Sequence, residues 1–267
     1  MRFCQSHPPP PDWRAWYWDD GRLLGWMPPE RATMLAQLLP RHLPLRQEGA
    51  GRWVWHAASA SVAERSQVLQ TIANDLYARG LIHGWRNERY ACWGNCDAAW
   101  PYPQPELFRL ERSAFRYFGL RSHAVHVHGI TVDGRMWCGR RAANKAIDPK
   151  LLDNLAAGGL PADEQPVHCA VREIQEEAGL HRTPKDFIGG VYEILSERAE
   201  PEGWHNERLF VYTTRLAAHE RPINRDGEVS EFMCLDLPEV LRRIQAGEFT
   251  LDAALCITTS YARYAHH

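Results

Sequence analysis

The sequence contains no apolar run that approaches the ~20 residues a membrane-spanning helix requires. Its first residues, MRFCQSHPPPPDW, lack the apolar segment of a secretory signal. Basic residues are not in excess either, because 31 Lys and Arg stand against 33 Asp and Glu, for a formal net charge of −2. These absences argue against a membrane partner and against a nucleic-acid partner. We therefore expect a cytoplasmic location.

The seven cysteines show no pattern of paired spacings, so a disulfide framework is not expected. Cys92 and Cys96 form a C-x3-C pair with His83 upstream, but a zinc site needs a second ligand pair, and none has suitable spacing. We interpret the cysteines, Cys4 among them, as reduced thiols.

Tryptophan, in contrast, is abundant: the chain has 11, and most of them lie in the first half. One interpretation is that a small N-terminal domain fills its core with large side chains. The other is an aromatic wall that holds a flat ligand. The first interpretation is the simpler one, and the sequence leaves both open.

The pattern changes near residue 120, where we place a boundary between domains 1–120 and 121–267. Before it, a hairpin is predicted around Asp20-Gly21, and the segment LFRLERSAFRYFG predicts a helix that ends at Gly119. After it, short alternating segments surround one or two helical ones. The sequence thus predicts a small α+β N-terminal domain followed by an α/β (α+β) sandwich.

The segment AVREIQEEAGL carries three carboxylates at helical spacing, those of Glu173, Glu176 and Glu177. On a helix they share one face, and the apolar residues between them share the face that can pack on a sheet. Carboxylates this close repel one another, and their natural counter-charge is a hard divalent cation such as Mg²⁺ or Mn²⁺. A solvated acidic helix face is the alternative.

The limits of this predicted helix are also marked. Pro166 is well placed near the first turn, and Gly179 is the residue type that ends helices. Arg172 lies four residues before Glu176 and can neutralise part of the acidic face.

The glutamates of this predicted helix are part of a longer sequence motif, which begins before the helix. The motif is Gly158-x5-Glu164-x7-Arg172-Glu173-Ile174-x-Glu176-Glu177-x-Gly179-Leu180. This string resembles the Nudix box, G-x5-E-x7-R-E-U-x-E-E-x-G-U with U apolar, at every specified position. The resemblance implies a Nudix α/β/α sandwich and metal-assisted attack of water on a diphosphate that is joined to an organic group. It also implies that the metal is Mg²⁺ or Mn²⁺.

The resemblance carries roles onto individual residues. Glu176 and Glu177 match a metal-binding pair, and Glu173 matches a third acidic position that is a ligand or the general base. Many members of the family use one more glutamate from a downstream loop, for which we favour Glu228. The predicted catalytic residues are Glu173, Glu177, Arg172 and Glu164, the last two as a supporting ion pair. The predicted metal ligands are Glu173, Glu176, Glu177, Glu228 and the backbone carbonyl of Ala157. Other available downstream glutamates are Glu231, Glu193, Glu197 and Glu207.

The substrate prediction depends on weaker motifs. The run K-x-x-x-P-x-x-L-D-N-L-x-A-G-G-L, together with GLIHGWRNERY and FGLRSHAVHVHG, resembles a Nudix subgroup that has an extra N-terminal domain and is thiamine-pyrophosphokinase-related. This implies a small-molecule substrate, thiamine diphosphate or its oxidised or damaged analogues, cleaved to monophosphate and phosphate. Aromatic side chains suit the flat, cationic thiazolium. The predicted substrate-binding residues are Arg140, Lys145, Asn154, Trp85 and Arg86.

Alternative functions remain open. A Nudix hydrolase could act on nucleotide sugars, dinucleotides or damaged nucleoside triphosphates. Isopentenyl-diphosphate isomerases share the fold, but they carry Cys-Gly-His where this chain has Ala157-Gly158-Gly159, and their box is degenerate. A non-catalytic binding module usually loses box glutamates, which are intact here. We therefore expect a hydrolase, and the family resemblance makes a homodimer a possible assembly.

Overall fold

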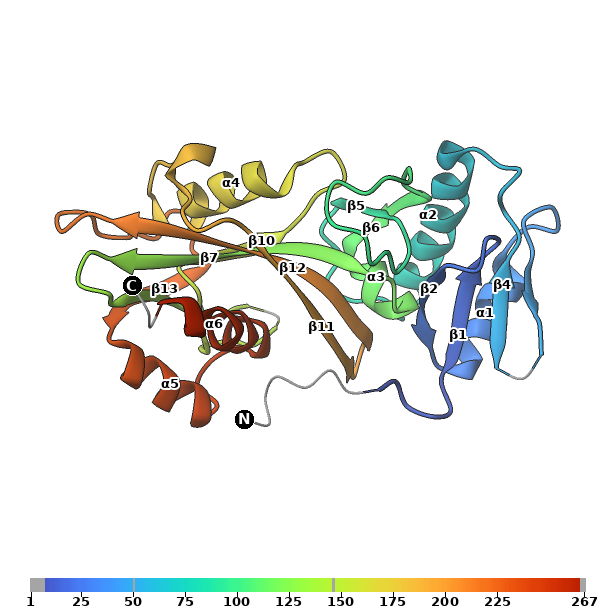
Figure 1. Ribbon diagram of the computed structural model, residues 1–267. Coiled ribbons are helices and arrows are strands. Elements are labelled where there is room, and N and C mark those ends of the chain that lie inside the picture. Colours follow the sequence, from blue (N-terminus) through green and yellow to red (C-terminus); the bar gives the residue numbers. More distant parts are fainter. Residues whose placement is uncertain (1–7, 50, 146, 265–267) are drawn as a thin grey trace. The chain divides into compact units, whose positions relative to one another are not determined.

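The computed structural model describes residues 8–49, 51–145 and 147–264 (Figure 1). These residues form two compact units. One consists of residues 8–122 with 197–207, and the other of residues 123–196 with 208–264. Both contain helices and strands, so the predicted mixed α/β class is confirmed. Cys4 lies outside the described residues.

The N-terminal unit contains a four-stranded sheet with the order β2-β1-β4-β3. Its strands are β1 (Arg14–Trp18), β2 (Leu23–Met27), β3 (Leu45–Gln47) and β4 (Arg52–Trp55). The β1–β2 hairpin turns where the sequence predicts it, with Gly21 at a φ of 88° that L-residues rarely adopt. Strands β1 and β4 run parallel.

The N-terminal unit also contains helices and a two-stranded sheet. The helices are α1 (Pro29–Leu38), α2 (Val62–Ala78) and α3 (Arg112–Phe118), and the sheet consists of β5 (Arg89–Cys92) and β6 (Phe108–Glu111). Helix α3 ends at Gly119 as predicted. Its predicted start was wrong, because 108–111 pairs with β5 as a strand. Phe108 and Leu110 alternate into the core there, and that tertiary packing overrides helical spacing.

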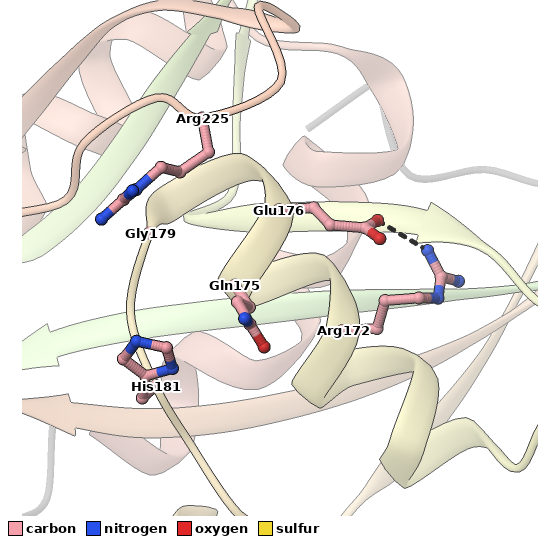
Figure 2. A pocket seen from close by; sticks show the side chains of 6 residues that line it. All are labelled: Arg172, Gln175, Glu176, Gly179, His181 and Arg225. Carbon is pink, nitrogen blue, oxygen red and sulfur yellow. Dashed lines mark hydrogen bonds and ion pairs between the residues drawn. The ribbon is translucent and has the colours of Figure 1, made fainter.

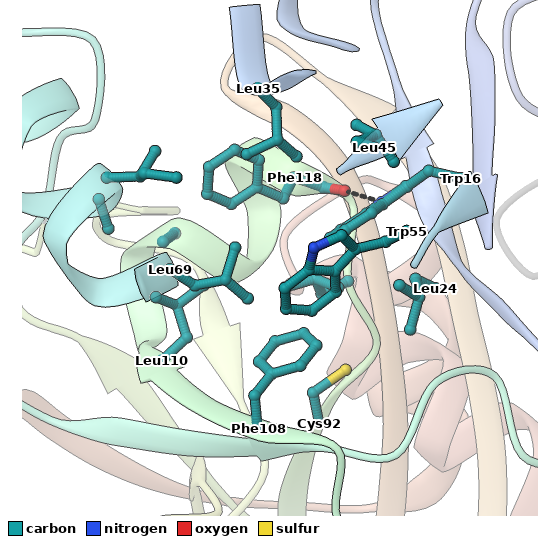
Figure 3. Close-up of a cluster of buried hydrophobic side chains, with 14 of the residues drawn as sticks. Trp16, Leu24, Leu35, Leu45, Trp55, Leu69, Cys92, Phe108, Leu110 and Phe118 are labelled. Atoms are coloured by element: carbon teal, nitrogen blue, oxygen red, sulfur yellow. Dashed lines mark hydrogen bonds between the residues drawn. The ribbon is translucent and has the colours of Figure 1, made fainter. Parts of the chain in front are cut away.

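The interior of the N-terminal unit packs tryptophan and phenylalanine rings among leucine side chains (Figure 3). Trp16 and Trp55 are fully buried, and the indole N–H of Trp16 donates to the backbone oxygen of Phe118 at 2.9 Å. Trp55 meets Phe108 edge to face, with ring centroids 5.6 Å apart. For these residues the core-filling interpretation is the one that the structure supports.

The second unit contains most of a seven-stranded sheet with the path β11-β12-β7-β8-β13. Its strands are β7 (Ser122–Thr131), β8 (Met136–Arg141), β9 (Leu152–Asp153), β10 (Ala156–Gly159), β11 (Tyr192–Glu200), β12 (Gly203–Leu216) and β13 (Val229–Leu235). Its helices are α4 (Pro166–Ala178), α5 (Leu237–Gln245) and α6 (Leu251–Tyr264), with a 3-10 turn at Pro184–Asp186. Helix α4 covers one face of the sheet, and α5 and α6 cover the other (Figure 1). This is the predicted α/β/α sandwich.

The sheet of this unit forks between β7 and β8. The two strands pair with each other at Gly129–Trp137 and Ile130–Met136. Farther along, the segment after β8 folds back between them, so that β9 pairs with β8 and β10 pairs with β7. The fork therefore places β10 beneath helix α4, with which it shares extensive contacts.

Helix α4 has the limits that the sequence predicts. Pro166 occupies the first helical position, and Gly179 ends the helix in the left-handed region at a φ of 64°. Ile174 and Ala178 are buried against the sheet. No helix among the described residues is both long enough and apolar enough to cross a membrane.

Candidate active site

Glu177 lies at the junction of helix α4 and strand β10. Its Oε2 accepts a hydrogen bond from the backbone N–H of Ala157 at 2.9 Å, and its side chain is buried. Strand β10 pairs antiparallel with β7, and Leu160 N–H donates to the oxygen of His123. Because hydrogen-bonded positions alternate along such a pair, Ala157 directs its N–H and C=O away from β7. The Ala157 carbonyl therefore opens to the side on which Glu177 lies.

Glu173 lies against the next residue of β10. A Cβ atom at Gly158 would fall 2.0 Å from Glu173 Oε1 and 2.1 Å from its Cδ, closer than any non-bonded atoms can approach. The glycine of the Nudix-like string thus makes room for a buried carboxylate. Without that room, Glu173 could not lie beside Glu177 on the inner face of the helix.

Arg172 holds three carboxylates at once. Its Nη2 donates to Glu164 Oε2 at 2.8 Å, while its Nη1 donates to Glu173 Oε1 at 2.7 Å and to Glu176 Oε2 at 2.9 Å. The planar guanidinium fork suits this arrangement, which a lysine could not reproduce. The predicted ion pair between Arg172 and Glu164 is thus present, and so is the predicted contact with Glu176. Glu176 itself is exposed on the outer face of α4.

A second group of acids approaches Glu177 from the segment before β13. Carboxylate oxygens of Glu177, Asp226 and Glu228 all lie within 4.8 Å of one another, and we call these three residues the carboxylate cluster. Their segment is fastened to the end of α4, because Ile223 N–H donates to the oxygen of Ala178 at 2.8 Å. Sequence reasoning selected Glu228 and missed Asp226, although the two are only two residues apart.

Gly179 is needed for this fastening as well as for ending the helix. A Cβ atom there would fall 2.8 Å from the backbone oxygen of Ile223 and 3.0 Å from Arg225 Nε. The bare backbone of Gly179 therefore allows the segment that carries Asp226 and Glu228 to lie against the helix.

The charge of the site is unbalanced in the protein alone. Burial raises the pKa of Glu173 to about 7, with Arg172 opposing the rise and Glu176 and Glu228 adding to it. Burial, followed by repulsion from Glu173, raises the pKa of Glu177 well above its ordinary value. Both shifts arise first from burial, and repulsion between neighbouring carboxylates adds to them, so ionising Glu173 and Glu177 together costs free energy in the protein alone.

Lys145 supplies part of the missing charge. Its ammonium group forms an ion pair with Glu228, and its side chain is 16% exposed. The backbone reinforces the contact, because Ala142 N–H donates to the oxygen of Glu228 at 2.8 Å. The structure thus brings the predicted Lys145 and the predicted Glu228 together beside Glu177.

An open pocket of about 380 Å³ lies on the outer side of α4, near its end (Figure 2). It is lined by Arg172, Gln175, Glu176, Gly179, His181 and Arg225. Figure 2 shows Arg225 reaching from its loop over the end of the helix. Within the described parts of the chain, Arg225 has no hydrogen-bond or ion-pair partner. Sequence reasoning missed this arginine, and its place three residues before the predicted Glu228 was the available signal.

The remaining predicted binding residues lie elsewhere. Arg140 pairs across strands with Glu231 of β13, and its Nη1 donates to the oxygen of Lys150 at 2.9 Å. Asn154 is 2% exposed, with its amide group hydrogen-bonded to two histidines of β7. The structure therefore does not bring the side chain of Asn154 to the surface of the site.

Trp85 and Arg86 belong to the N-terminal unit. Trp85 is half-buried and stacks on Tyr77, with ring centroids 4.7 Å apart, and its indole N–H donates to Asn87. The side chain of Arg86 is exposed, while its backbone N–H donates to Glu111 at 3.0 Å.

The donor set of the site fits a hard divalent cation. It consists of carboxylate oxygens and a carbonyl, with no thiolate or imidazole, which is the chemistry that Mg²⁺ and Mn²⁺ prefer. The raised pKa values of Glu173 and Glu177 are what such a cation would reverse.

Comparison with known proteins matches both parts of the chain to families. Residues 121–254 match the NUDIX domain, and residues 19–122 match a domain of unknown function, DUF4743. Nudix hydrolase 24 from Arabidopsis thaliana, a chloroplastic protein, is 30% identical over 74% of this chain and 53% of its own length. Nudix hydrolase 20 from the same plant, also chloroplastic, is 32% identical over 70% of this chain and 49% of its own length.

A third relative, the uncharacterized yeast protein YJR142W from Saccharomyces cerevisiae, is 25% identical over 76% of this chain and 63% of its own length. The chain thus spans about half to two thirds of the length of these relatives. The NUDIX match covers half of the chain and includes every residue of the box and of the carboxylate cluster. This protein therefore belongs to the Nudix family, with a DUF4743 domain before its Nudix domain.

Proposed function

We propose that this protein is a divalent-cation-dependent hydrolase of diphosphates that are joined to an organic group. The observation that carries the proposal is the convergence of Glu177, Asp226 and Glu228 within 4.8 Å, beside a Nudix box with all of its glutamates. A binding module would not need to keep four acids whose repulsion destabilises the fold.

The residues that would hold Mg²⁺ or Mn²⁺ are Glu173, Glu176, Glu177, Asp226, Glu228 and the carbonyl of Ala157. When bound, the cation neutralises charge on the diphosphate and lowers the pKa of a bound water. Backbone N–H groups already orient two of these carboxylates: Ala157 N–H donates to Glu177 Oε2 at 2.9 Å, and Glu228 N–H donates to Asp226 Oδ1 at 2.8 Å. Glu176 is exposed and its carboxylate is paired with Arg172, so Glu176 could bind the cation only after that ion pair is released.

Side chains of the protein would accept the proton of the attacking water and orient the reacting groups. Glu173 accepts the proton of the attacking water, whose oxygen bonds to phosphorus while the bridging P–O bond breaks. Arg172 keeps Glu173 in place through its 2.7 Å hydrogen bond and is itself held by Glu164. Lys145 reaches the phosphate from its position beside Glu228. Arg225 is available for a further anionic group of the substrate.

We infer that the organic group is thiamine-like, because the subgroup motifs extend over both domains. The substrate would be thiamine diphosphate or an oxidised or damaged analogue, and the products a monophosphate and phosphate. In the N-terminal unit, the half-buried ring of Trp85 offers a flat face of the kind that stacks on a cationic heterocycle. Arg86 beside it is exposed.

A substrate panel tests this proposal. The protein with Mg²⁺ would receive thiamine diphosphate, its oxo and oxy analogues, ADP-ribose, a dinucleotide, isopentenyl diphosphate and a nucleoside triphosphate, with phosphate and product mass as the readout. Fastest turnover of a thiamine-type diphosphate supports the substrate class. Faster turnover of a nucleotide substrate supports diphosphate hydrolysis but contradicts the thiamine-type substrate. Binding without turnover of any member contradicts the hydrolase proposal.

A further inference from the structure

A chain of buried hydrogen bonds lies on the face of the sheet opposite helix α4. His126 and His128 of β7 are two residues apart and so point to the same face. His126 Nδ1 lies 2.8 Å from Asn154 Oδ1, Asn154 Nδ2 lies 3.1 Å from His128 Nδ1, and His128 Nε2 lies 3.0 Å from Ser260 Oγ on α6. All four residues are at most 5% exposed.

The donors and acceptors in this chain run in one direction. The amide nitrogen of Asn154 can only donate, so His128 Nδ1 accepts and His128 carries its proton on Nε2. That N–H donates to Ser260, whose hydroxyl donates to the backbone oxygen of Cys256 at 2.6 Å. At the other end, His126 Nδ1–H donates to the amide oxygen of Asn154. Every polar group of Asn154's side chain is therefore used inside the protein.

Asn154 lies at the fork of the sheet, between β9 and β10. Its backbone oxygen accepts from Gly139 N–H of β8 at 3.2 Å, while its side chain binds the two histidines of β7. One residue thus ties together the two strands that separate at the fork. Asp153 extends the contact, because its carboxylate pairs with Arg141 at 3.2 Å and lies 3.7 Å from His126 Nδ1.

The residues just after the fork are the ones against which the catalytic glutamates lie. Ala157 N–H orients Glu177, and Gly158 makes room for Glu173. Both residues belong to β10, and Asn154 fixes the backbone just before this strand begins. A shift of β10 would move the hydrogen-bond donor of Glu177 and the space that Glu173 fills, and errors of about 1 Å in such groups lower rates strongly.

We propose that Asn154, held by His126 and His128, is a positioning residue that fixes β10 and, through it, Glu177 and Glu173. This inference rests on the proposed function for its catalytic consequence and on the hydrogen-bond geometry for its structural one. It gives Asn154 an indirect role, in place of the direct substrate contact that the sequence predicts.

The test compares Asn154→Ala and the milder His128→Gln with Val240→Ala, a fully buried core residue of α5 that is outside the network. Mn²⁺ affinity, thermal stability and hydrogen exchange of the Ala157 amide are measured for each, with kcat and KM for the fastest diphosphate. We expect Asn154→Ala to weaken Mn²⁺ binding about 10-fold or more, as loss of supporting hydrogen bonds around metal ligands typically does. It should also speed exchange at Ala157 and lower kcat more than it raises KM.

His128→Gln should change these quantities in the same direction by less, and it decides the question if Asn154→Ala does not fold. Val240→Ala should lower stability while leaving Mn²⁺ affinity and Ala157 exchange unchanged. If the network variants match Val240→Ala in both quantities, the inference is overturned. If the unaltered protein binds no Mn²⁺, the proposed function fails, and exchange at Ala157 alone decides whether Asn154 positions β10.

Discussion

The carboxylate of Glu173 occupies the space where a side chain at Gly158 would begin, with Oε1 2.0 Å from the position of a Cβ atom. The two residues are 15 positions apart in the sequence, on β10 and α4. Gly158 is therefore needed for close contact with helix α4 and not for an unusual backbone conformation, since it is not among the residues with positive φ.

Gly158→Ala should displace Glu173 and lower the hydrolysis rate roughly 100-fold, the scale of a misplaced catalytic group. The added methyl group meets a buried carboxylate that Arg172 and the helix hold in place. Steady-state kinetics at saturating Mg²⁺ would measure the effect, with circular dichroism to verify folding. A folded variant with unchanged kcat would show that Glu173 is not needed where it lies.

The metal-free protein should lose stability as pH rises through the titration of its buried glutamates. Because folding raises the pKa of Glu173 from 4.5 to about 7, the folded state binds more protons than the unfolded state in that window. The free energy of unfolding therefore falls as pH rises across it, and Glu177 acts in the same sense. In EDTA at pH 8, the melting temperature of Glu177→Gln should be higher than that of the unaltered protein. At pH 5 the difference between the two melting temperatures should be smaller.

With Mg²⁺ at pH 8, the unaltered protein should have the higher melting temperature, because a bound cation stabilises only the protein that retains its ligands. Differential scanning calorimetry with and without Mg²⁺ checks both parts. Equal melting temperatures of the two proteins in EDTA at pH 8 would mean that the ionised carboxylate of Glu177 does not destabilise the metal-free fold.

The limits of helix α4 could be predicted from the sequence because local residues determine them. Pro166, Gly179 and the spacing of the three glutamates act within one element, and the structure confirms the limits of that element. The approach of Asp226 could not be predicted in this way, since it depends on the hydrogen bond from Ile223 to the end of the helix. The same holds for Arg140, which the register between β8 and β13 places opposite Glu231.

Burial was the other limit of prediction. Residues 108–111 have helical spacing in the sequence, but they form a strand because the core of the N-terminal unit takes Phe108 and Leu110. Asn154 is polar and adjoins the box, which favoured a surface role, and yet the fork of the sheet encloses it. Neither outcome follows from local residue preferences.

His128 should make the protein sensitive to acid. Burial lowers the pKa of His128 from 6.5 to about 3, so the unfolded state binds the proton more readily than the folded state between these values. Its contribution to stability is full above pH 6.5 and is lost as pH falls toward 3. Urea unfolding between pH 7 and pH 5 should show a steeper loss for the unaltered protein than for His128→Gln. Parallel curves would refute the assignment of this loss to His128.

Arg225→Gln should raise KM for a diphosphate roughly 10-fold or more with little change in kcat, because a charged hydrogen bond to the substrate is worth about 1.5–3 kcal/mol. The matched control is Arg242→Gln on α5, where the arginine pairs with Glu239 at the surface. Unchanged KM in Arg225→Gln would leave the pocket at the end of α4 without a role in substrate binding.

If buried carboxylates and a divalent cation together bring about hydrolysis of a diphosphate, the release of phosphate must depend on both. We would measure the rate of phosphate release from the fastest member of the substrate panel, with Mg²⁺ and with EDTA, for the unaltered protein, Glu177→Gln and the surface control Glu239→Gln. We predict release that requires Mg²⁺, a loss of roughly 100-fold or more in Glu177→Gln and an unchanged rate in Glu239→Gln. Release that persists in EDTA, or at full rate in Glu177→Gln, would contradict the account.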